Sequence, residues 1–86
     1  MKKDYELLSF IQGSRRKSVL SVLNEGVKTP KEIAEKCKIS ISNVSNTLSE
    51  LVEKKLVICK NPNSHIYKYY EITNRGKELL KEIDKH

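Results

Sequence analysis

Apolar residues at the start of the chain gather into two segments that predict short helices. Residues 5–11 are rich in apolar side chains, and a short helix there is expected to end near Gly13. Ser14 can cap a second helix over residues 15–24, and Gly26 is expected to stop it, because glycine takes a left-handed backbone at no steric cost. The inward stripe of the second helix has helical spacing: Val19, Leu20, Val22 and Leu23.

The clearest local signal is the start of a third helix at residues 29–32, whose sequence is Thr-Pro-Lys-Glu. This order predicts a capping box, in which Thr29 accepts a hydrogen bond from the amide of Glu32 and Glu32 reaches back to the amide of Thr29. Pro30 stands at the first helical position, where its missing N–H costs nothing. The buried side of this short helix is expected to consist of Ile33, Ala34 and Cys37.

A fourth helix with two contrasting faces is expected over residues 41–55, after a tight connection at Ile39 and with Ser40 as its cap. No charged residue occurs from residue 39 to residue 49, although a solvated helix face normally carries Lys or Glu. Ser and Asn are mediocre helix formers, so something other than helix propensity is expected to keep them there. The apolar face carries Val44, Leu48, Leu51 and Val52. The polar face carries Ser42, Ser45, Asn46 and Ser49.

The hydrophobic period then changes, and β-branched and aromatic residues predict two strands, over residues 56–60 and 66–72. Residues 61–65, Asn-Pro-Asn-Ser-His, have turn chemistry, so the strands are expected to form a hairpin. Alternation places Tyr69 and Tyr70 on opposite faces. We expect the tyrosines of this strand to pack in the core, and stacking on single-stranded bases is the alternative.

A last helix is expected over residues 74–85, with Thr73 as its cap. Gly76 lies early in this helix, where it lowers helix propensity but allows another segment to pack closely. The apolar stripe of this helix consists of Leu79, Leu80 and Ile83.

The length and charge of the chain bound its organisation and its partners. At 86 residues there is room for one modest core, so a single domain over residues 1–86 is expected. A net charge of +6 favours a polyanion such as nucleic acid or an anionic membrane surface. No apolar run approaches a membrane span, and no apolar stretch typical of a secretion signal follows the charged residues 1–4. We expect a cytoplasmic protein with no membrane partner.

Motifs for catalysis are missing from the sequence. It contains no paired-carboxylate motif, no nucleophile with a nearby base, no glycine-rich phosphate loop and no metal-ligand spacing. Cys37 and Cys59 lack CxxC spacing and are expected to be free thiols, with a disulfide or a redox switch as the alternative. We expect no enzyme activity, no cofactor, no metal and no small-molecule ligand.

Three segments resemble winged-helix transcription regulators. Residues 33–48 resemble the helix-turn-helix of that family, and residues 51–57, Leu-Val-Glu-Lys-Lys-Leu-Val, resemble its exit into the wing. Residues 69–76, Tyr-Tyr-Glu-Ile-Thr-Asn-Arg-Gly, resemble the second wing strand and the start of the last helix in regulators of the ArsR and MarR types. The resemblance covers residues from about 14 to 80. It implies a winged helix-turn-helix fold, mainly α with a small β-hairpin wing, and sequence-specific binding of double-stranded DNA.

The sequence departs from the family pattern in the helix-turn-helix. Lys38 stands where the turn usually holds Gly, so a slightly different turn is expected, since a left-handed backbone disfavours a residue with a side chain. Near Asn46 the fourth helix lacks the Arg or Lys that often reads guanine. The cysteine cluster of arsenic-type regulators is also absent, and nothing supports metal sensing.

The resemblance implies that the helix beginning after Ser40 enters the major groove of DNA. Asn can pair with adenine, and Ser can donate or accept at several base edges. We expect Asn43 and Asn46 to contact bases and Ile41 to meet a thymine methyl group; alternatively, this face is only solvated. The expected recognition residues are Ser40, Ile41, Ser42, Asn43, Ser45, Asn46 and Ser49.

The DNA backbone is expected to be contacted from the hairpin and from two helix starts. The hairpin tip carries no acidic residue and can lie along the backbone or in the minor groove, and an ordinary polar turn is the alternative. Amides at the start of the third helix can hold a phosphate, while the basic cluster at residues 15–17 contacts DNA or only solvates a helix start. The expected wing contacts are Lys60, Asn61, Asn63, Ser64, His65 and Lys68. The expected phosphate contacts are Thr29, Lys31, Arg15 and Arg16.

The first and last helices, about residues 4–12 and 74–85, carry more apolar side chains than so small a domain needs. Regulators of the resembled types usually form homodimers through these elements, so we expect a homodimer that reads a palindromic site. Completion of the chain's own core is the alternative. The expected interface residues are Tyr5, Leu8, Phe10, Ile11, Leu79, Leu80 and Ile83. Rival functions of the fold are a protein–protein interaction module and an RNA or unusual-duplex binder.

Overall fold

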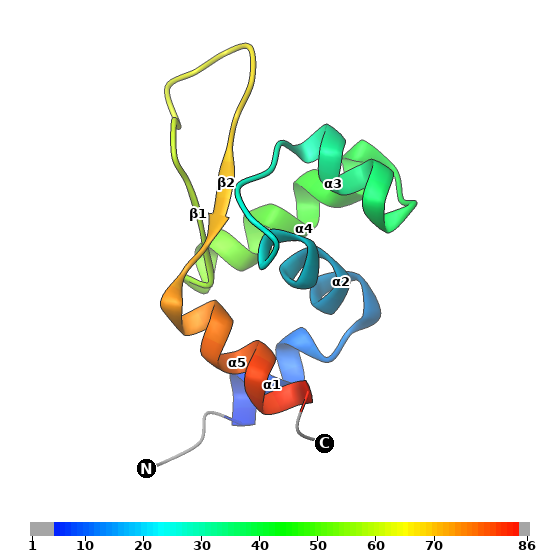
Figure 1. The fold of residues 1–86 in the computed structure, drawn as a ribbon, viewed down its shortest axis with the longest axis vertical. Coiled ribbons are helices and arrows are strands. Elements are labelled where there is room, and N and C mark those ends of the chain that lie inside the picture. The colour runs from blue at the N-terminus through cyan, green and yellow to red at the C-terminus, as the bar shows by residue number, and fades with distance from the viewer. Residues whose placement is uncertain (1–4, 85–86) are drawn as a thin grey trace.

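A computed structural model describes residues 5–84 of the chain. These residues form five helices and one two-stranded antiparallel sheet, with the wing at one end of the molecule and the first and last helices at the other (Figure 1). The order confirms the expected winged helix-turn-helix. The elements are α1 (Tyr5–Ile11), α2 (Ser14–Leu23), α3 (Pro30–Cys37), α4 (Ile41–Glu53), β1 (Val57–Cys59), β2 (Tyr70–Ile72) and α5 (Asn74–Asp84).

The two helices of the helix-turn-helix begin at the caps that the sequence predicts. The Thr29 hydroxyl accepts from the amide of Glu32 at 3.3 Å, and the Glu32 carboxylate accepts from the amide of Thr29 at 2.9 Å, which completes the capping box. Pro30 is the first residue of α3. The Ser40 hydroxyl accepts from the amide of Asn43 at 3.1 Å and caps α4. Both helix starts are therefore fixed by local chemistry.

The turn between α3 and α4 has the left-handed residue that glycine supplies in other members of the fold. Lys38 has φ 58° and ψ 43°, and the amide of Ile39 donates to the carbonyl of Ala34 at 3.2 Å. The expected difference in turn shape is therefore wrong. Lys38 accepts the strain instead, which amounts to roughly 1–2 kcal/mol for a residue with a side chain.

Helix ends differ from the predicted ones by one or two residues. α2 begins at Ser14 itself, with Gly13 at the cap position, so Ser14 is not the cap. The same helix ends at Leu23, and Gly26, with φ 148°, lies in the turn beyond it. α4 ends at Glu53, two residues before the expected end, because Lys55 turns into a left-handed conformation with φ 62°.

The second strand is shorter than predicted. β1 and β2 pair antiparallel, with Val57 opposite Ile72 and Cys59 opposite Tyr70. Tyr70 also pairs with Lys28, whose amide donates to the Tyr70 carbonyl at 3.1 Å and whose carbonyl accepts from the Tyr70 amide at 2.8 Å. Residues 66–69 are not strand, because an asparagine side chain, described below, takes the place of the strand ladder there.

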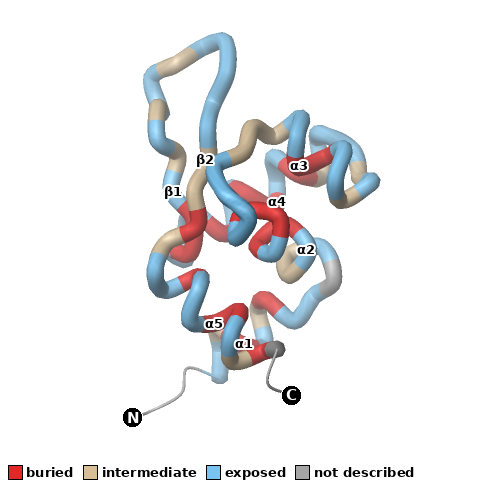
Figure 2. The backbone as a smooth tube through the Cα atoms, viewed as in Figure 1, coloured by how far each residue is buried: buried red, intermediate tan, exposed pale blue. Residues whose placement is uncertain are grey.

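One core holds the described elements together, and Figure 2 shows the exposed wing extending from it. Thr47, which the apolar pattern did not include, is buried on the inner side of α4, whereas Val52, expected on that side, is 39% exposed. The buried apolar residues are Leu8, Ile11, Val19, Leu20, Val22, Leu23, Ile33, Ala34, Val44, Leu48, Leu51, Leu56, Val57, Ile72, Leu79, Leu80 and Ile83.

Gly76 lets α5 pack against the exit from α4. A Cβ at this position would lie 2.5 Å from the carbonyl oxygen of Leu56 and 2.7 Å from the side chain of Ile72. Thr73 caps α5 by accepting from the amide of Gly76 at 3.1 Å, while its hydroxyl donates to the carbonyl of Lys55 at 2.9 Å. The expected cap and the expected close approach are both confirmed.

The terminal helices pack on each other within one chain, and their apolar side chains serve its core. Tyr5 is 72% exposed and Phe10 is partly buried. Residues 4 and 85 of the expected helices, like the charged residues 1–4, lie outside the described residues. Among the described residues, no helix is long and apolar enough to cross a membrane. The side chains expected between subunits but buried within the chain are Leu8, Ile11, Leu79, Leu80 and Ile83.

Candidate nucleic-acid interface

The polar face of α4 is exposed, as the sequence predicts. Val44, Thr47 and Leu48 anchor the helix from the inner side, which turns the Ser and Asn positions outward. Ile41, the first residue of α4, is 52% exposed and belongs to the outer side. Asn43 is only half-exposed. The exposed polar residues of this face are Ser42, Ser45, Asn46 and Ser49.

The wing is shaped by one asparagine. The side-chain amide of Asn61 donates to the carbonyl of Tyr67 at 2.7 Å, and its side-chain oxygen accepts from the amide of Tyr69 at 2.8 Å. The amide of Lys60 donates to the carbonyl of Tyr69 at 2.8 Å and closes the base of the loop. Asn61 was expected to contact DNA, but its side chain is engaged in holding the two arms of the wing together.

The remaining predicted wing residues divide by what they touch. Asn63, His65 and Lys68 are exposed. Ser64 is half-buried, and its hydroxyl accepts from the amide of Ile66 at 3.4 Å. Lys60 and Glu71 form a loose ion pair at 3.9 Å. The wing therefore presents Lys68 on its second arm, and Glu71 balances part of the charge of Lys60 at its base.

A groove lies between the start of α3, the outer side of α4 and the second arm of the wing. We call it the recognition groove. Its α4 wall is an i, i+4, i+8 row of side chains, so the three point to the same side of the helix. Its wing wall includes two exposed tyrosines, and a lysine lies at the α3 end. These residues are Ile41, Ser45, Ser49, Tyr67, Tyr69 and Lys31.

The start of α3 offers fewer anion-binding amides than the sequence suggests. Pro30 has no N–H, and the amides of Thr29 and Glu32 are used within the capping box. The amide and the side chain of Lys31 are the donors left in the first turn. The Glu32 carboxylate stays at the groove's edge as a charged group, because the backbone hydrogen bond from Thr29, followed by that from its hydroxyl, holds the pKa of Glu32 below its usual value.

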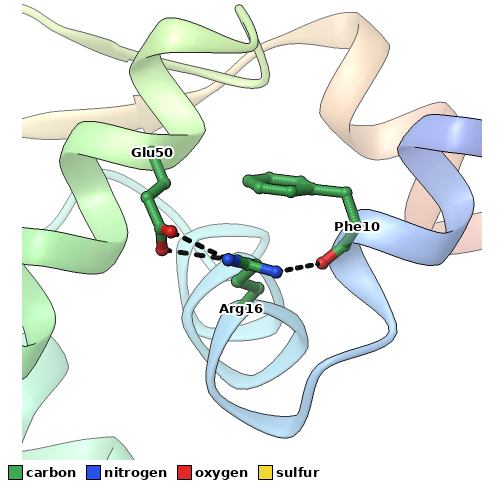
Figure 3. A network of polar contacts seen from close by, with 3 residues as sticks. All are labelled: Phe10, Arg16 and Glu50. Atoms are coloured by element: carbon green, nitrogen blue, oxygen red, sulfur yellow. Dashed lines mark hydrogen bonds and ion pairs between the residues drawn. The ribbon is translucent and has the colours of Figure 1, made fainter.

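Arg16 is part of a structural network that joins three helices (Figure 3). Its guanidinium donates to both carboxylate oxygens of Glu50, at 2.8 and 3.3 Å, and to the carbonyl of Phe10 at 3.0 Å. The guanidinium carbon also lies 4.0 Å from the centre of the Phe10 ring. The hydrogen bond from Arg16 lowers the pKa of Glu50 and the pair raises the pKa of Arg16. Arg16, expected at a phosphate, is instead engaged with Glu50 and Phe10 of the same chain at the surface, whereas Arg15 is exposed.

The tyrosines of the second arm are the groove residues that sequence reasoning missed. Only Tyr70 packs against the core, and burial raises the pKa of its hydroxyl. Tyr67 is 64% exposed and Tyr69 is 43% exposed, so the expected core packing holds for Tyr70 alone. Asn61 was a signal in the sequence for this exposure, because a turn asparagine often bonds to backbone across its loop. Its bonds to Tyr67 and Tyr69 end the strand pairing, so alternation along a strand does not apply to these two residues.

The two cysteines are free thiols, as expected. Cys37 is partly buried, and desolvation raises the pKa of its thiol. Cys59 lies with its sulfur 3.9 Å from the side-chain oxygen of Asn61. Within residues 5–84, no three His, Cys, Asp or Glu side chains come together in a way that could hold a metal ion.

Several solved structures are similar to this chain. Wild-type ZitR from Lactococcus lactis, in complex with DNA, is 30% identical with a TM-score of 0.74, and the match covers 85% of this chain and 51% of that one. A second ZitR structure, described as a zinc-responsive MarR family member, is 27% identical with a TM-score of 0.72 over 86% of this chain and 51% of ZitR. The adhesin competence repressor AdcR from Streptococcus pyogenes is 21% identical with a TM-score of 0.72, over 86% of this chain and 55% of AdcR, and supports the fold alone.

This chain spans about half the length of those regulators. No curated protein matches its sequence significantly. The family model described as sugar-specific transcriptional regulator TrmB matches residues 17–73, which run from α2 through the helix-turn-helix and the wing to the cap of α5. The chain therefore belongs to the TrmB family of transcriptional regulators.

Proposed function

We propose that this chain is a sequence-specific regulator that binds double-stranded DNA, with α4 in the major groove and the wing on the backbone or in the minor groove. The observation that carries the proposal is the exposed, uncharged Ser and Asn face of α4, which the buried inner side of Val44, Thr47, Leu48 and Leu51 turns outward. A helix face that meets only solvent normally carries Lys or Glu, whereas Ser and Asn can form hydrogen bonds with base edges. The similarity to ZitR, which was solved with DNA, supports the proposal.

Asn46 is the strongest candidate for base contact, because it is exposed at the middle of the outer side of α4. Asn43 is half-buried, and Ser40 uses its hydroxyl as the cap of α4, so both have less freedom to turn toward DNA. An asparagine amide pairs bidentately with adenine N6 and N7. Ser42, Ser45 and Ser49 are proposed to contact base edges or phosphates.

The affinity is proposed to come from lysines at the edges of the recognition groove. Lys31 lies at the start of α3 and Lys68 on the wing, so both can reach phosphates that flank a major groove occupied by α4. Each phosphate neutralised gives a slope of about −0.9 in log K against log salt concentration. Arg15, exposed at the start of α2, is a further candidate, whereas the engaged Arg16 is not.

A homodimer at the α1 and α5 end is part of the proposal, and it agrees with the position of these helices opposite the wing (Figure 1). Pairing there would leave both recognition helices free to meet two half-sites. We expect sedimentation at micromolar concentration to give twice the 9.9 kDa chain mass, and a species of 9.9 kDa alone would refute the dimer. We also propose a cytoplasmic location, as befits a DNA-binding regulator.

The experiment that tests the function is selection of bound sequences from a random duplex pool, followed by anisotropy titrations of the selected duplex at several salt concentrations. We expect one enriched motif and an affinity that falls linearly with log salt. A pool without enrichment, or an affinity that does not respond to salt, would refute the proposal.

A protein–protein module is the second candidate, and the exposed apolar side chains of the wing favour it. Ile66 is 82% exposed and Tyr67 is 64% exposed. Such a module would show no preference for a duplex over heparin, a generic polyanion. The same titrations with heparin and with RNA duplexes as competitors separate this candidate, and an RNA binder, from the proposed function.

A further inference from the structure

We propose that the recognition groove selects A·T base pairs, and that Ile41 does so by packing against the C5-methyl group of thymine. The inference rests on the proposed function, and it adds the class of base pair that the site prefers. It follows from one exposed aliphatic side chain, from the charges near it, and from the walls of the groove.

The exposure of Ile41 is not explained by packing within the chain. It is the first residue of α4, just after the cap, and 52% of it is exposed, while Val44, Leu48 and Leu51 supply the apolar contacts of the helix. A β-branched residue is also a mediocre helix former. Ile41 shares its row with Ser45, one turn further along the same wall of the groove. An aliphatic group at this position can contact only apolar atoms of a base edge, and thymine carries the methyl group that fits.

The charges near the groove disfavour the other bases. Guanine is read mainly by Arg or Lys, and α4 contains neither in its 13 residues. Cytosine offers an amino donor that a free carboxylate would accept. Of the two acids on α4, Glu50 is paired with Arg16 at 2.8 Å, and the exposed Glu53 is the last residue of the helix and does not line the groove. Glu32 lines the groove, but its carboxylate is held in the capping box. Adenine is therefore the base that we expect Asn46 to contact, and thymine is the base that we expect Ile41 to contact.

The wing wall makes burial of a methyl group more favourable. Tyr67 and Tyr69 line the same groove as Ile41 and expose large apolar surfaces to it. Removing a methyl group from water is favourable in proportion to the apolar area covered. A duplex seated in the groove would therefore gain affinity from each thymine methyl that reaches Ile41.

The test replaces thymine by uracil, one position at a time, in the duplex selected by this protein. Uracil lacks only the C5-methyl group, so hydrogen bonding of the base pair is preserved. We expect an A·T-rich motif, and a loss of about fourfold in affinity at the thymine that Ile41 contacts, the effect of exposing one methyl group. Ile41→Ala should bind thymine and uracil duplexes equally.

Ile58→Ala is the matched control, because Ile58 is 46% exposed on β1 and does not line the recognition groove. It should keep the full difference between thymine and uracil. Equal binding of both duplexes by the wild-type protein, or a G·C-rich selected motif, would overturn the inference while leaving DNA binding intact. Failure to bind any duplex would instead refute the proposed function. The wild-type comparison decides the matter even if Ile41→Ala does not fold.

Discussion

At the scale of single residues, similar uncharged polar side chains have different roles, which depend on the hydrogen-bonding groups within their reach. Thr29 and Ser40 close helix starts, and Asn61 replaces a strand ladder, whereas Asn46 extends from α4 with its side chain exposed. The local sequence predicts the roles of Thr29 and Ser40, because a capping side chain bonds to an amide three residues further along the chain. The role of Asn61 depends on atoms six and eight residues away, which no local pattern specifies.

Asn61→Ala should loosen the wing while leaving the core intact. It removes the hydrogen bonds to the Tyr67 carbonyl and the Tyr69 amide, both in an exposed loop. We expect a loss of unfolding free energy of about 1 kcal/mol, faster hydrogen exchange at the Tyr69 amide, and weaker DNA binding. Asn63→Ala, at an exposed asparagine of the same turn, is the control and should change none of these. Equal behaviour of the two variants would contradict the assigned role of Asn61.

The Arg16 and Glu50 pair predicts a pH dependence of stability. The pKa of Glu50 is lower in the folded chain than its usual value of 4.5 because Arg16 donates to the carboxylate. The contribution of Glu50 is therefore present above pH 4.5 and lost as the pH falls through the lower folded value. We expect Glu50→Gln to lower the urea midpoint at neutral pH and to converge on wild type in acid. A gap that persists in acid, or one equally large for Glu35→Gln, would argue against the pair.

At the scale of elements, the sequence predicts starts better than ends. Helix starts follow from caps that bond within three residues, and those of α3, α4 and α5 are as predicted. The ends of α4 and β2 depend on contacts distant in sequence. The carbonyl of Lys55, just after α4, accepts from the Thr73 hydroxyl, and Asn61 bonds to the backbone of Tyr67 and Tyr69 before β2. The burial of Thr47 and the exposure of Val52 also depend on how neighbours lie around α4, which its own periodicity cannot specify.

Lys38→Gly should stabilise the helix-turn-helix. Lys38 has φ 58°, which is unfavourable for a residue with a side chain and costs glycine nothing. After the greater flexibility of glycine in the unfolded chain is subtracted, we expect a gain of about 0.5–1 kcal/mol in urea unfolding. Lys77→Gly, inside α5, should instead lose roughly 0.5–1 kcal/mol. A destabilised Lys38→Gly would mean that this turn is not strained in the folded protein.

At the scale of the whole molecule, the sequence was sufficient for the fold and for part of the candidate interface. The exposed face of α4 was predictable from its missing charges. The hydrogen bonds of Arg16 to Glu50 and of Asn61 to the Tyr67 carbonyl were not predictable, because only the fold brings these partners close. The burial of Leu8 and Leu80 within the chain shows the same limit, since an apolar stripe indicates burial and does not say against which surface.

The most direct measurement for the central claim is the base preference of Asn46→Ala at every position of the selected duplex. We expect the variant to keep its stability, because Asn46 is exposed, and to lose about 1–3 kcal/mol of discrimination at one position while the other positions are unchanged. A variant with the same preference at every position, or one weakened uniformly across all sequences, would contradict base reading by the outer face of α4.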